Sequence, residues 1–279
     1  AKAANGGMDV EMPSTVLFGE HLLQAVRKGS VPESVIDEAA LRVVRTLLTF
    51  AQDRPPARES VLGCKEHIRL ALQAAREGIT LLKNRDGVLP LNRRKIKKLV
   101  VLGALAEEQV IGDHGSSQVF PPYVVTPLQG IANAAPGVDV IYYSGENIGH
   151  AKDLARQADA VIFVVGYRCT DEGEFVSEDM SDLDGEYPGG DRTESLGLHP
   201  KDVRMIQEVG PLNPQSTVFL IGGNMILMED WKDSVSAILM AYYPGMEGGT
   251  AMGEILFGDV NPSGKLPYVV PVRAEDLPP

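Results

Sequence analysis

The chain has 279 residues, 44% of them hydrophobic and 23% charged, which is the composition of a globular protein of one or two domains. Its 38 acidic and 26 basic residues give a formal net charge of −12, which argues against nucleic acid and anionic membranes as main partners. No apolar stretch is long enough to span a bilayer, and the five scattered histidines lack a metal-binding spacing, so we expect neither a membrane span nor a metal.

The first part of the chain is predicted to be helical. An amphipathic pattern over residues 20–28 ends at Gly29, and apolar residues recur at helical spacing over 35–48. Residues 53–58 include two prolines, which a helix interior does not tolerate, and therefore indicate a linker. We predict an N-terminal domain over 1–52, a linker over 53–64 and a second domain over 65–279.

The second part alternates between predicted strands and helices. The six expected strands are 79–82, 99–102, 138–143, 160–165, 217–221 and 237–242. The expected helices are 65–77, 148–158, 201–209 and 248–256. This alternation predicts an α/β fold with a mainly parallel sheet that is covered on both faces.

An acidic loop follows the apolar run at 160–166, and it is the first candidate site. In open α/β sheets, ligands bind at the edge where such loops leave the strands. Most carboxylates of the segment 169–198 are expected to be solvated surface groups, but Glu172, close to the strand exit, is best placed for a pocket. A carboxylic acid there could serve as a general acid, and Glu174 could be its neighbour or the acid itself.

Three other segments contain candidate features, each with a purely structural alternative. The segment 111–119 combines glycines with His114, Ser117 and Gln118 and could approach a ligand or form a tight surface turn. It lacks the spacing of a phosphate loop, which disfavours a nucleotide-dependent enzyme. Glycines before the helix at 248–256 could bind an anion, although tight packing is the more economical interpretation. The segment 8–13, which contains Met12, is by itself only a charged turn.

Ordered motifs along nearly the whole chain resemble glycoside hydrolase family 3, the group of β-glucosidases and β-xylosidases. One is Gly-Met-Asp-Val-Glu-Met-Pro at 7–13, and another is Leu-Phe-Gly-Asp-Val-Asn-Pro-Ser-Gly-Lys-Leu-Pro at 256–267. Further matching segments are 29–39, 78–84, 89–91, 115–117, 121–128, 190–192 and 243–250.

The resemblance implies a six-stranded, mostly parallel α/β sandwich preceded by the last helices of a (β/α)8-type barrel, with residues 1–52 as the barrel remnant. It implies a barrel aspartate as nucleophile and a glutamate of the sandwich domain as acid/base. That glutamate corresponds to Glu172, with Glu174 as the alternative. His114, Ser117 and Gln118 would line the substrate on the aglycone side, and Met12 would belong to the substrate-binding barrel segment.

The nucleophilic aspartate of the family precedes the motif at 7–13, so it lies upstream of Ala1, and Asp9 does not take its place. We therefore expect part of a retaining exo-acting β-glucosidase without a cofactor, acting on β-linked oligosaccharides or on aryl and alkyl β-glucosides, as in cellulose degradation. Both carboxyl groups are needed for this reaction, so missing sequence or a second chain would supply the barrel half. The alternative is a non-catalytic saccharide-binding or interaction domain that kept the fold.

Three properties stay open at the level of the sequence. The chain begins at Ala1 without an initiator Met or a secretory segment, so we expect it to be processed, truncated or partial. A soluble protein in the cytoplasm, in the periplasm or outside the cell is compatible with this start, and so is a homo-oligomer. The sequence does not decide whether Cys64 and Cys169 pair.

Overall fold

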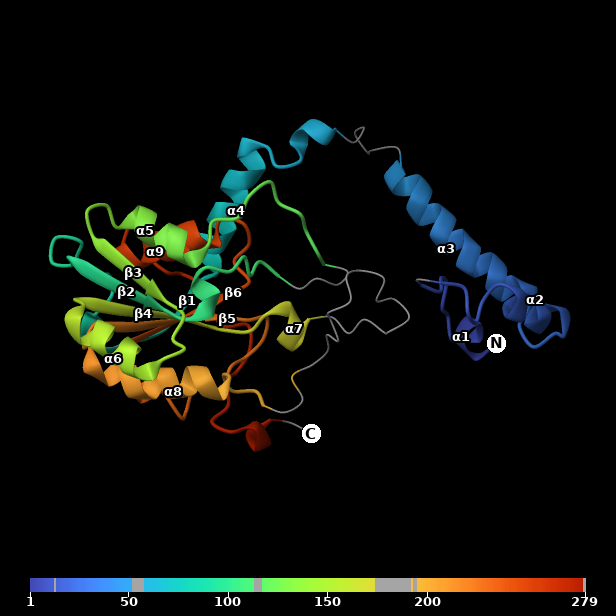
Figure 1. Cartoon of the computed structure of the whole chain (residues 1–279). Helices are drawn as coiled ribbons and strands as arrows, with labels where there is room; N and C mark the ends of the chain where they lie inside the picture. Colours follow the sequence, from blue (N-terminus) through green and yellow to red (C-terminus); the bar gives the residue numbers. More distant parts are fainter. Residues whose placement is uncertain (13, 52–57, 113–116, 174–191, 193–194, 278–279) are drawn as a thin grey trace. The chain divides into compact units, whose positions relative to one another are not determined.

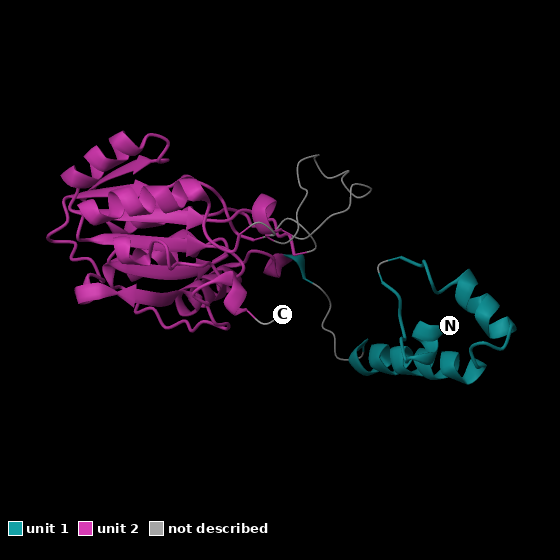
Figure 2. Cartoon of the chain, turned by 90° about the horizontal axis from the view of Figure 1, so that it is seen from below, with its two compact units in different colours: residues 1–59 teal, residues 60–279 magenta. Residues whose placement is uncertain are grey.

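The computed structural model describes residues 1–12, 14–51, 58–112, 117–173, 192 and 195–277. These residues form two compact units, Ala1–Glu59 and Ser60–Pro279, which are coloured separately in Figure 2.

The first unit is helical, with α1 at Lys2–Asn5, α2 at Glu20–Arg27 and α3 at Glu33–Ala51. Its buried hydrophobic side chains among the described residues are Ala4 and Val31. Along α3, by contrast, Leu47, Leu48 and Phe50 are each about 60% exposed (63%, 60% and 59%). The apolar stripe that makes this helix amphipathic therefore has little of this unit to pack against.

The second unit is built around a six-stranded sheet (Figure 1). Its strands are β1 (Thr80–Asn84), β2 (Lys98–Leu102), β3 (Asp139–Tyr143), β4 (Ala160–Gly166), β5 (Ser216–Ile221) and β6 (Ala237–Tyr242). They lie in the order β1-β6-β5-β4-β2-β3, and only β1 runs antiparallel to its neighbour. The predicted α/β fold with a mostly parallel, six-stranded sheet is confirmed.

Alternating side chains of the strands enter two separate hydrophobic cores. In β4, Ile162 and Val164 belong to one core, whereas Val161, Phe163 and Val165 belong to the other. Helices cover both faces, so the central strands are apolar on both sides and appear in the sequence as continuous apolar runs.

The helices divide between the two faces as Figure 1 shows (Figure 1). One face is covered by α4 (Lys65–Gly78), α5 (Pro127–Ala134) and α9 (Gly248–Phe257), and the other by α6 (Ile148–Gln157) and α8 (Pro200–Val209). A single helical turn, α7 (Cys169–Glu172), follows β4. Of the helices in the described part of the chain, none is both long and apolar enough to cross a membrane.

The sequence patterns did not predict α5, although its start has a clear local signal. Thr126 accepts a hydrogen bond from the Gln129 N–H at 3.3 Å, Gln129 accepts one from the Thr126 N–H at 3.1 Å, and Pro127 occupies the first turn. This is a capping box with a favourable N-terminal proline. The helix packs closely on α9, because Gly130 and Gly249 carry no Cβ atoms that would collide with the opposing backbone. The glycines in the first turn of α9 therefore serve helix packing.

A surface ion-pair network joins α6 to α8 and makes stability dependent on acidity. Glu208 accepts hydrogen bonds from Arg204 at 2.7 Å and from Lys152 at 2.5 Å, and these contacts, that of Arg204 first, lower the pKa of Glu208 to about 2. The contribution is complete above the unfolded-state pKa of about 4.3 and disappears as the pH falls toward 2. We expect Glu208→Gln to flatten the acid limb of the stability profile in this window, as measured by urea unfolding between pH 2 and 7. The exposed Glu275→Gln is the matched control, and an unchanged acid limb in Glu208→Gln would contradict the assignment.

A close approach of β4 and β5 constrains Gly166, the last residue of β4. Its φ is +141°, and a Cβ atom there would collide with the carbonyl oxygen of Ile221. We expect Gly166→Ala to destabilise the second unit by about 2 kcal/mol or more in chemical unfolding. The exposed helical Gly78 has no atom within 4 Å of the position that a Cβ would take, so Gly78→Ala should be neutral or slightly stabilising. Similar effects of the two substitutions would show that the strand contact is not the constraint.

Candidate active site

The candidate site lies where three neighbouring parallel strands end. Glu172 follows β4, Gly223 follows β5 and Tyr243 follows β6. Because β4, β5 and β6 are adjacent and share one direction, the segments after them meet at the same edge of the sheet. In α/β folds this carboxyl edge is the usual place for ligand binding.

The first residues of the acidic segment form a helical turn, whereas the sequence predicted a loop. The backbone N–H of Arg168 donates to Asp171 Oδ2 at 2.8 Å, and the N–H of Gly173 donates to the Cys169 carbonyl at 2.7 Å. The acidic side chain therefore caps the turn that contains it, which favours α7 over an open loop. Glu172 is the last residue of this turn.

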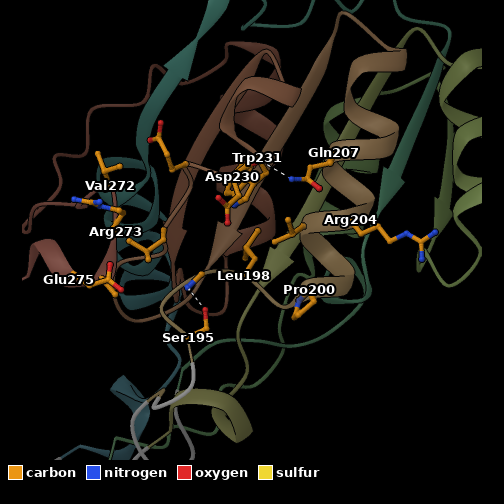
Figure 3. A pocket seen from close by; sticks show the side chains of 15 residues that line it. Ser195, Leu198, Pro200, Arg204, Gln207, Asp230, Trp231, Val272, Arg273 and Glu275 are labelled. Carbon is orange, nitrogen blue, oxygen red and sulfur yellow. Dashed lines mark hydrogen bonds between the residues drawn. The ribbon is translucent and has the colours of Figure 1, made fainter.

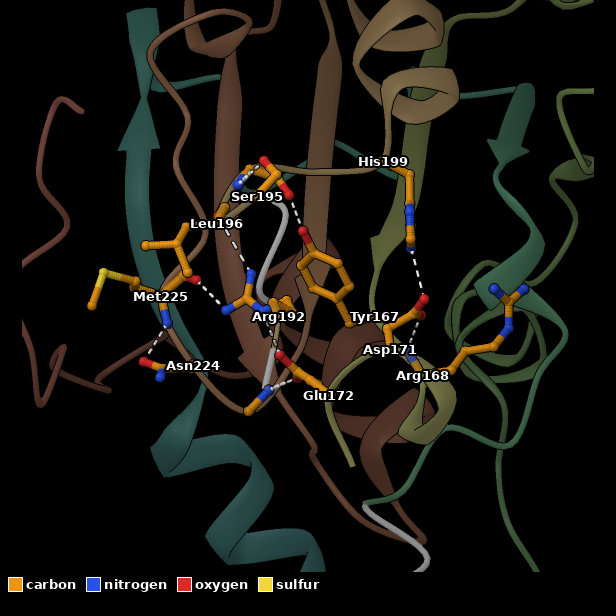
Figure 4. A network of polar contacts seen from close by, with 12 residues as sticks. Tyr167, Arg168, Asp171, Glu172, Arg192, Ser195, Leu196, His199, Asn224 and Met225 are labelled. Carbon is orange, nitrogen blue, oxygen red and sulfur yellow. Dashed lines mark hydrogen bonds and ion pairs between the residues drawn. The ribbon is translucent and has the colours of Figure 1, made fainter. Parts of the chain in front are cut away.

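The carboxylate of Glu172 is enclosed and fully engaged by other groups (Figure 4). Arg192 Nε lies 3.0 Å from Glu172 Oε2, and the two side chains are only 7% and 8% exposed. Glu172 Oε1 accepts hydrogen bonds from the Tyr243 hydroxyl at 2.7 Å and from the N–H of Gly223. Both oxygens thus face protein donors.

The guanidinium group of Arg192 has further partners besides Glu172, namely two backbone carbonyl groups and an aromatic ring. It donates to the carbonyl of Met225 at 2.6 Å and to the carbonyl of Leu196 at 3.4 Å. Its guanidinium carbon also lies 4.2 Å from the ring centroid of the buried Tyr167, in cation–π geometry. The planar cation therefore joins the β4 exit to two further segments of the chain.

The donor Tyr243 is held in its protonated form. Burial is the main cause that raises the pKa of Tyr243 above its usual value, and the hydrogen bond to Glu172 adds to it. The preceding residue, Tyr242, has a φ of +56°, an unfavourable conformation for a side chain of this size. This local strain at the end of β6 accompanies the turn that carries Tyr243 toward Glu172.

Two further ion pairs fix α7 to its surroundings. Arg168 at the start of the turn pairs with Glu108 at 2.5 Å, and Asp171 Oδ1 lies 3.1 Å from His199 Nε2. Glu108 follows β2, and β2 and β4 are the strands between which the chain order of the sheet reverses. The pair Arg168–Glu108 therefore bridges the switch point of the sheet, the favoured ligand crevice in open α/β folds.

A hollow of about 540 Å³ lies beside the segment that follows Arg192 (Figure 3). Its lining includes Ser195, Leu198, Trp231 and Arg273, from the segment before α8, the connection between β5 and β6, and the C-terminal segment. Neither Glu172 nor Arg192 is among its described lining residues. The hollow is therefore distinct from the site that Glu172 and Arg192 form at the strand ends.

Of the remaining residues proposed from the sequence, two are described in the second unit and one in the first. Ser117 and Gln118 are exposed on the segment after β2, and Met12 is 78% exposed in the first unit. His114 and Glu174 lie outside the described residues. Within the part of the chain that the structure describes, no three His, Cys, Asp or Glu side chains gather as metal ligands would.

Sequence reasoning did not assign a role to Arg192, Gly223 or Tyr243. A signal for Arg192 was available, because it is the only Lys or Arg in the acidic segment 169–198. A lone cation among so many carboxylates indicates a specific partner. Gly223 and Tyr243 had no comparable local signal, because their role arises only when β4, β5 and β6 lie side by side.

Comparison with known proteins gives a consistent result. Residues 79–279 match the glycosyl hydrolase family 3 C-terminal domain. The chain is 30% identical to a β-glucosidase of Bacteroides ovatus over 99% of its length and 40% of the relative. It is 35% identical to β-D-xylosidase 3 of Arabidopsis thaliana over 96% of its length and 34% of the relative.

Solved structures agree with these relatives. The β-D-glucoside glucohydrolase from Trichoderma reesei superposes with a TM-score of 0.80 at 25% identity, over 98% of this chain and 41% of that structure. The β-glucosidase of Bifidobacterium adolescentis gives 0.77 at 27% identity, over 98% and 39%. The chain thus spans about two fifths or less of these proteins and aligns with their C-terminal part. It belongs to glycoside hydrolase family 3, and most of its length is the C-terminal domain of that family.

Proposed function

We propose that this chain is the C-terminal part of a retaining exo-β-glycosidase that releases terminal, non-reducing β-D-glucosyl residues. The observation that carries the proposal is the match to family 3 enzymes over nearly the whole chain, including β-glucosidases at 29% and 30% identity. The 35% identity to a β-D-xylosidase makes xylosyl residues the second candidate. The two sugars differ by one hydroxymethyl group, so both belong in the test.

The reaction needs a barrel that this chain does not contain in full. In a retaining mechanism one carboxylate attacks the sugar while the other protonates the leaving oxygen, and the two lie about 5–5.5 Å apart. We assign the nucleophile to the upstream barrel and the acid/base to the acidic segment after β4. The exposed apolar stripe of α3, with Leu47, Leu48 and Phe50, supports the interpretation of the first unit as the end of such a barrel.

Two carboxyl groups compete for the acid/base role, Glu172 and Glu174. An acid/base must exchange its proton with the substrate and then with water, so one of its oxygens must be available to them. The two oxygens of Glu172 already accept from Arg192, Tyr243 and Gly223, and its side chain is 8% exposed. These contacts support Glu174 as the acid/base, with Glu172 as the alternative that the test below must exclude.

The activity itself can be tested with p-nitrophenyl β-D-glucoside and p-nitrophenyl β-D-xyloside. We expect no hydrolysis by the chain alone, because we assign the nucleophile to the upstream barrel. We expect hydrolysis, faster for the glucoside, once the chain is joined to a family 3 barrel half. Saccharide binding without turnover in the joined protein would instead support the non-catalytic saccharide-binding alternative. A faster reaction with the xyloside would assign the enzyme to the xylosidases.

The choice between the two glutamates can be tested in the same joined protein. We expect Glu174→Ala to lower kcat for p-nitrophenyl β-D-glucoside by about 10²–10⁴-fold, the usual contribution of a general acid/base. Azide should restore part of the rate and give the β-glycosyl azide, because a small anion can attack the glycosyl-enzyme without a base. Glu178→Ala, a nearby carboxylate in the same segment, is the control and should retain activity. Azide rescue of Glu172→Ala instead would move the role to Glu172.

A further inference from the structure

Arg192 and Glu172 stand at opposite ends of the acidic segment, yet their side chains meet. The distance from Arg192 Nε to Glu172 Oε2 is 3.0 Å, and both side chains are more than nine-tenths buried. A buried ion pair is costly to desolvate and persists only where the geometry satisfies both ions. The two ends of the segment are therefore joined at a defined point on the sheet edge.

The contacts of Arg192 require the shape of a guanidinium group. Its nitrogens reach three acceptors, the Glu172 carboxylate and the carbonyls of Met225 and Leu196, while its plane lies over the Tyr167 ring. The compact ammonium group of a lysine could keep the charge but could not make all of these contacts at once. Charge and geometry can therefore be separated by the substitution Arg192→Lys.

The pair acts directly on α7. Arg192 also touches one of the hydrophobic cores through the ring of Tyr167, the residue that follows β4. Glu172 is the last residue of α7, a turn with three backbone hydrogen bonds. The N–H groups of Asp171 and Glu172 donate to the Arg168 carbonyl at 3.0 and 3.2 Å, and that of Gly173 donates to the Cys169 carbonyl at 2.7 Å. Such a short turn is not stable by itself and depends on contacts outside it.

We propose that Arg192 is a positioning residue for the acid/base, because its pair with Glu172 holds α7, the described start of the acidic segment, at the strand ends. This inference rests on the proposed function. Tyr243 and Gly223 complete the arrangement by holding the other carboxylate oxygen of Glu172. The enclosed pair donates no proton to the substrate, and Glu174 does the chemistry.

Hydrogen exchange in the chain as it exists tests the structural part of the inference. We expect Arg192→Met and Arg192→Lys to increase exchange in peptides covering 168–173 by about ten-fold or more, with β4, β5 and β6 unchanged. Arg156→Met is the matched control, because this arginine forms an exposed pair with Asp153 on α6. Unchanged exchange of 168–173 in both Arg192 variants would overturn the proposal.

A double-substitution cycle tests whether Arg192 acts through Glu172. Arg192→Met leaves a buried carboxylate without its cation, whereas adding Glu172→Gln removes that charge. We expect the double variant to recover part of the thermal stability that Arg192→Met loses. Strictly additive losses of thermal stability would show that the two side chains act independently. That result would contradict the proposal that Arg192 acts through its pair with Glu172.

The effect of the leaving group tests the positioning role in the protein joined to a barrel. A misplaced general acid matters for a poor leaving group such as p-methoxyphenol and little for 2,4-dinitrophenol, which needs no protonation. We expect Arg192→Lys to lower kcat/KM for the p-methoxyphenyl glucoside at least about ten times more than for the dinitrophenyl glucoside. Equal losses on both substrates would mean a general loss of structure and would overturn the positioning role.

The two proposals fail in different ways. If the joined wild-type protein hydrolyses neither substrate, the proposed function fails, whereas the exchange and double-substitution results still decide whether the pair holds α7. If azide rescues Glu172→Ala, Glu172 is itself the acid/base, and the positioning role of its pair is overturned even though the enzyme class stands.

Discussion

The parallel arrangement of β4, β5 and β6 is the constraint on which the candidate site depends. Parallel neighbours end at the same edge, so the residues after three strands that are distant in sequence come within hydrogen-bonding distance. Glu172, Gly223 and Tyr243 meet for this reason, and the contacts of Glu172 with the other two follow from it. The sheet can hold this edge firmly because helices bury both of its faces.

A buried ion pair at such an edge is not explained by stability alone. Removing a charge from water costs several kcal/mol per ion. A protein with two apolar side chains of similar size in place of a buried ion pair is often as stable. What the pair Glu172–Arg192 provides is direction, because its acceptors and the Tyr167 ring admit one orientation of the guanidinium group. The pairs Arg168–Glu108 and Asp171–His199 and this pair all involve one short turn or the residue before it. Their concentration there is what a reactive group close to the turn would require.

The fold was predictable from the sequence to a large extent, whereas the contacts of the site were not. The strands were found because each central one is an apolar run between breakers, as in 160–165 and 237–242. The apolar periodicity does not predict helix α5 because the helix is short, although Thr126, Pro127 and Gln129 mark its start. The turn α7 was expected to be a loop because its carboxylates suggested solvent, and only the tertiary contacts of Asp171 and Glu172 reveal why they fold back.

The sequence resemblance and the geometry answer different questions about the acidic segment. The resemblance places an acid/base a few residues after the strand, and by position alone Glu172 fits. The geometry shows that the Glu172 carboxylate is already enclosed by protein donors, and this is the reason for proposing Glu174, two residues later, as the acid/base. Positional reasoning alone does not separate two carboxylates that are two residues apart. Glu172 and Glu174 can thus have different roles although the sequence presents them as near equivalents.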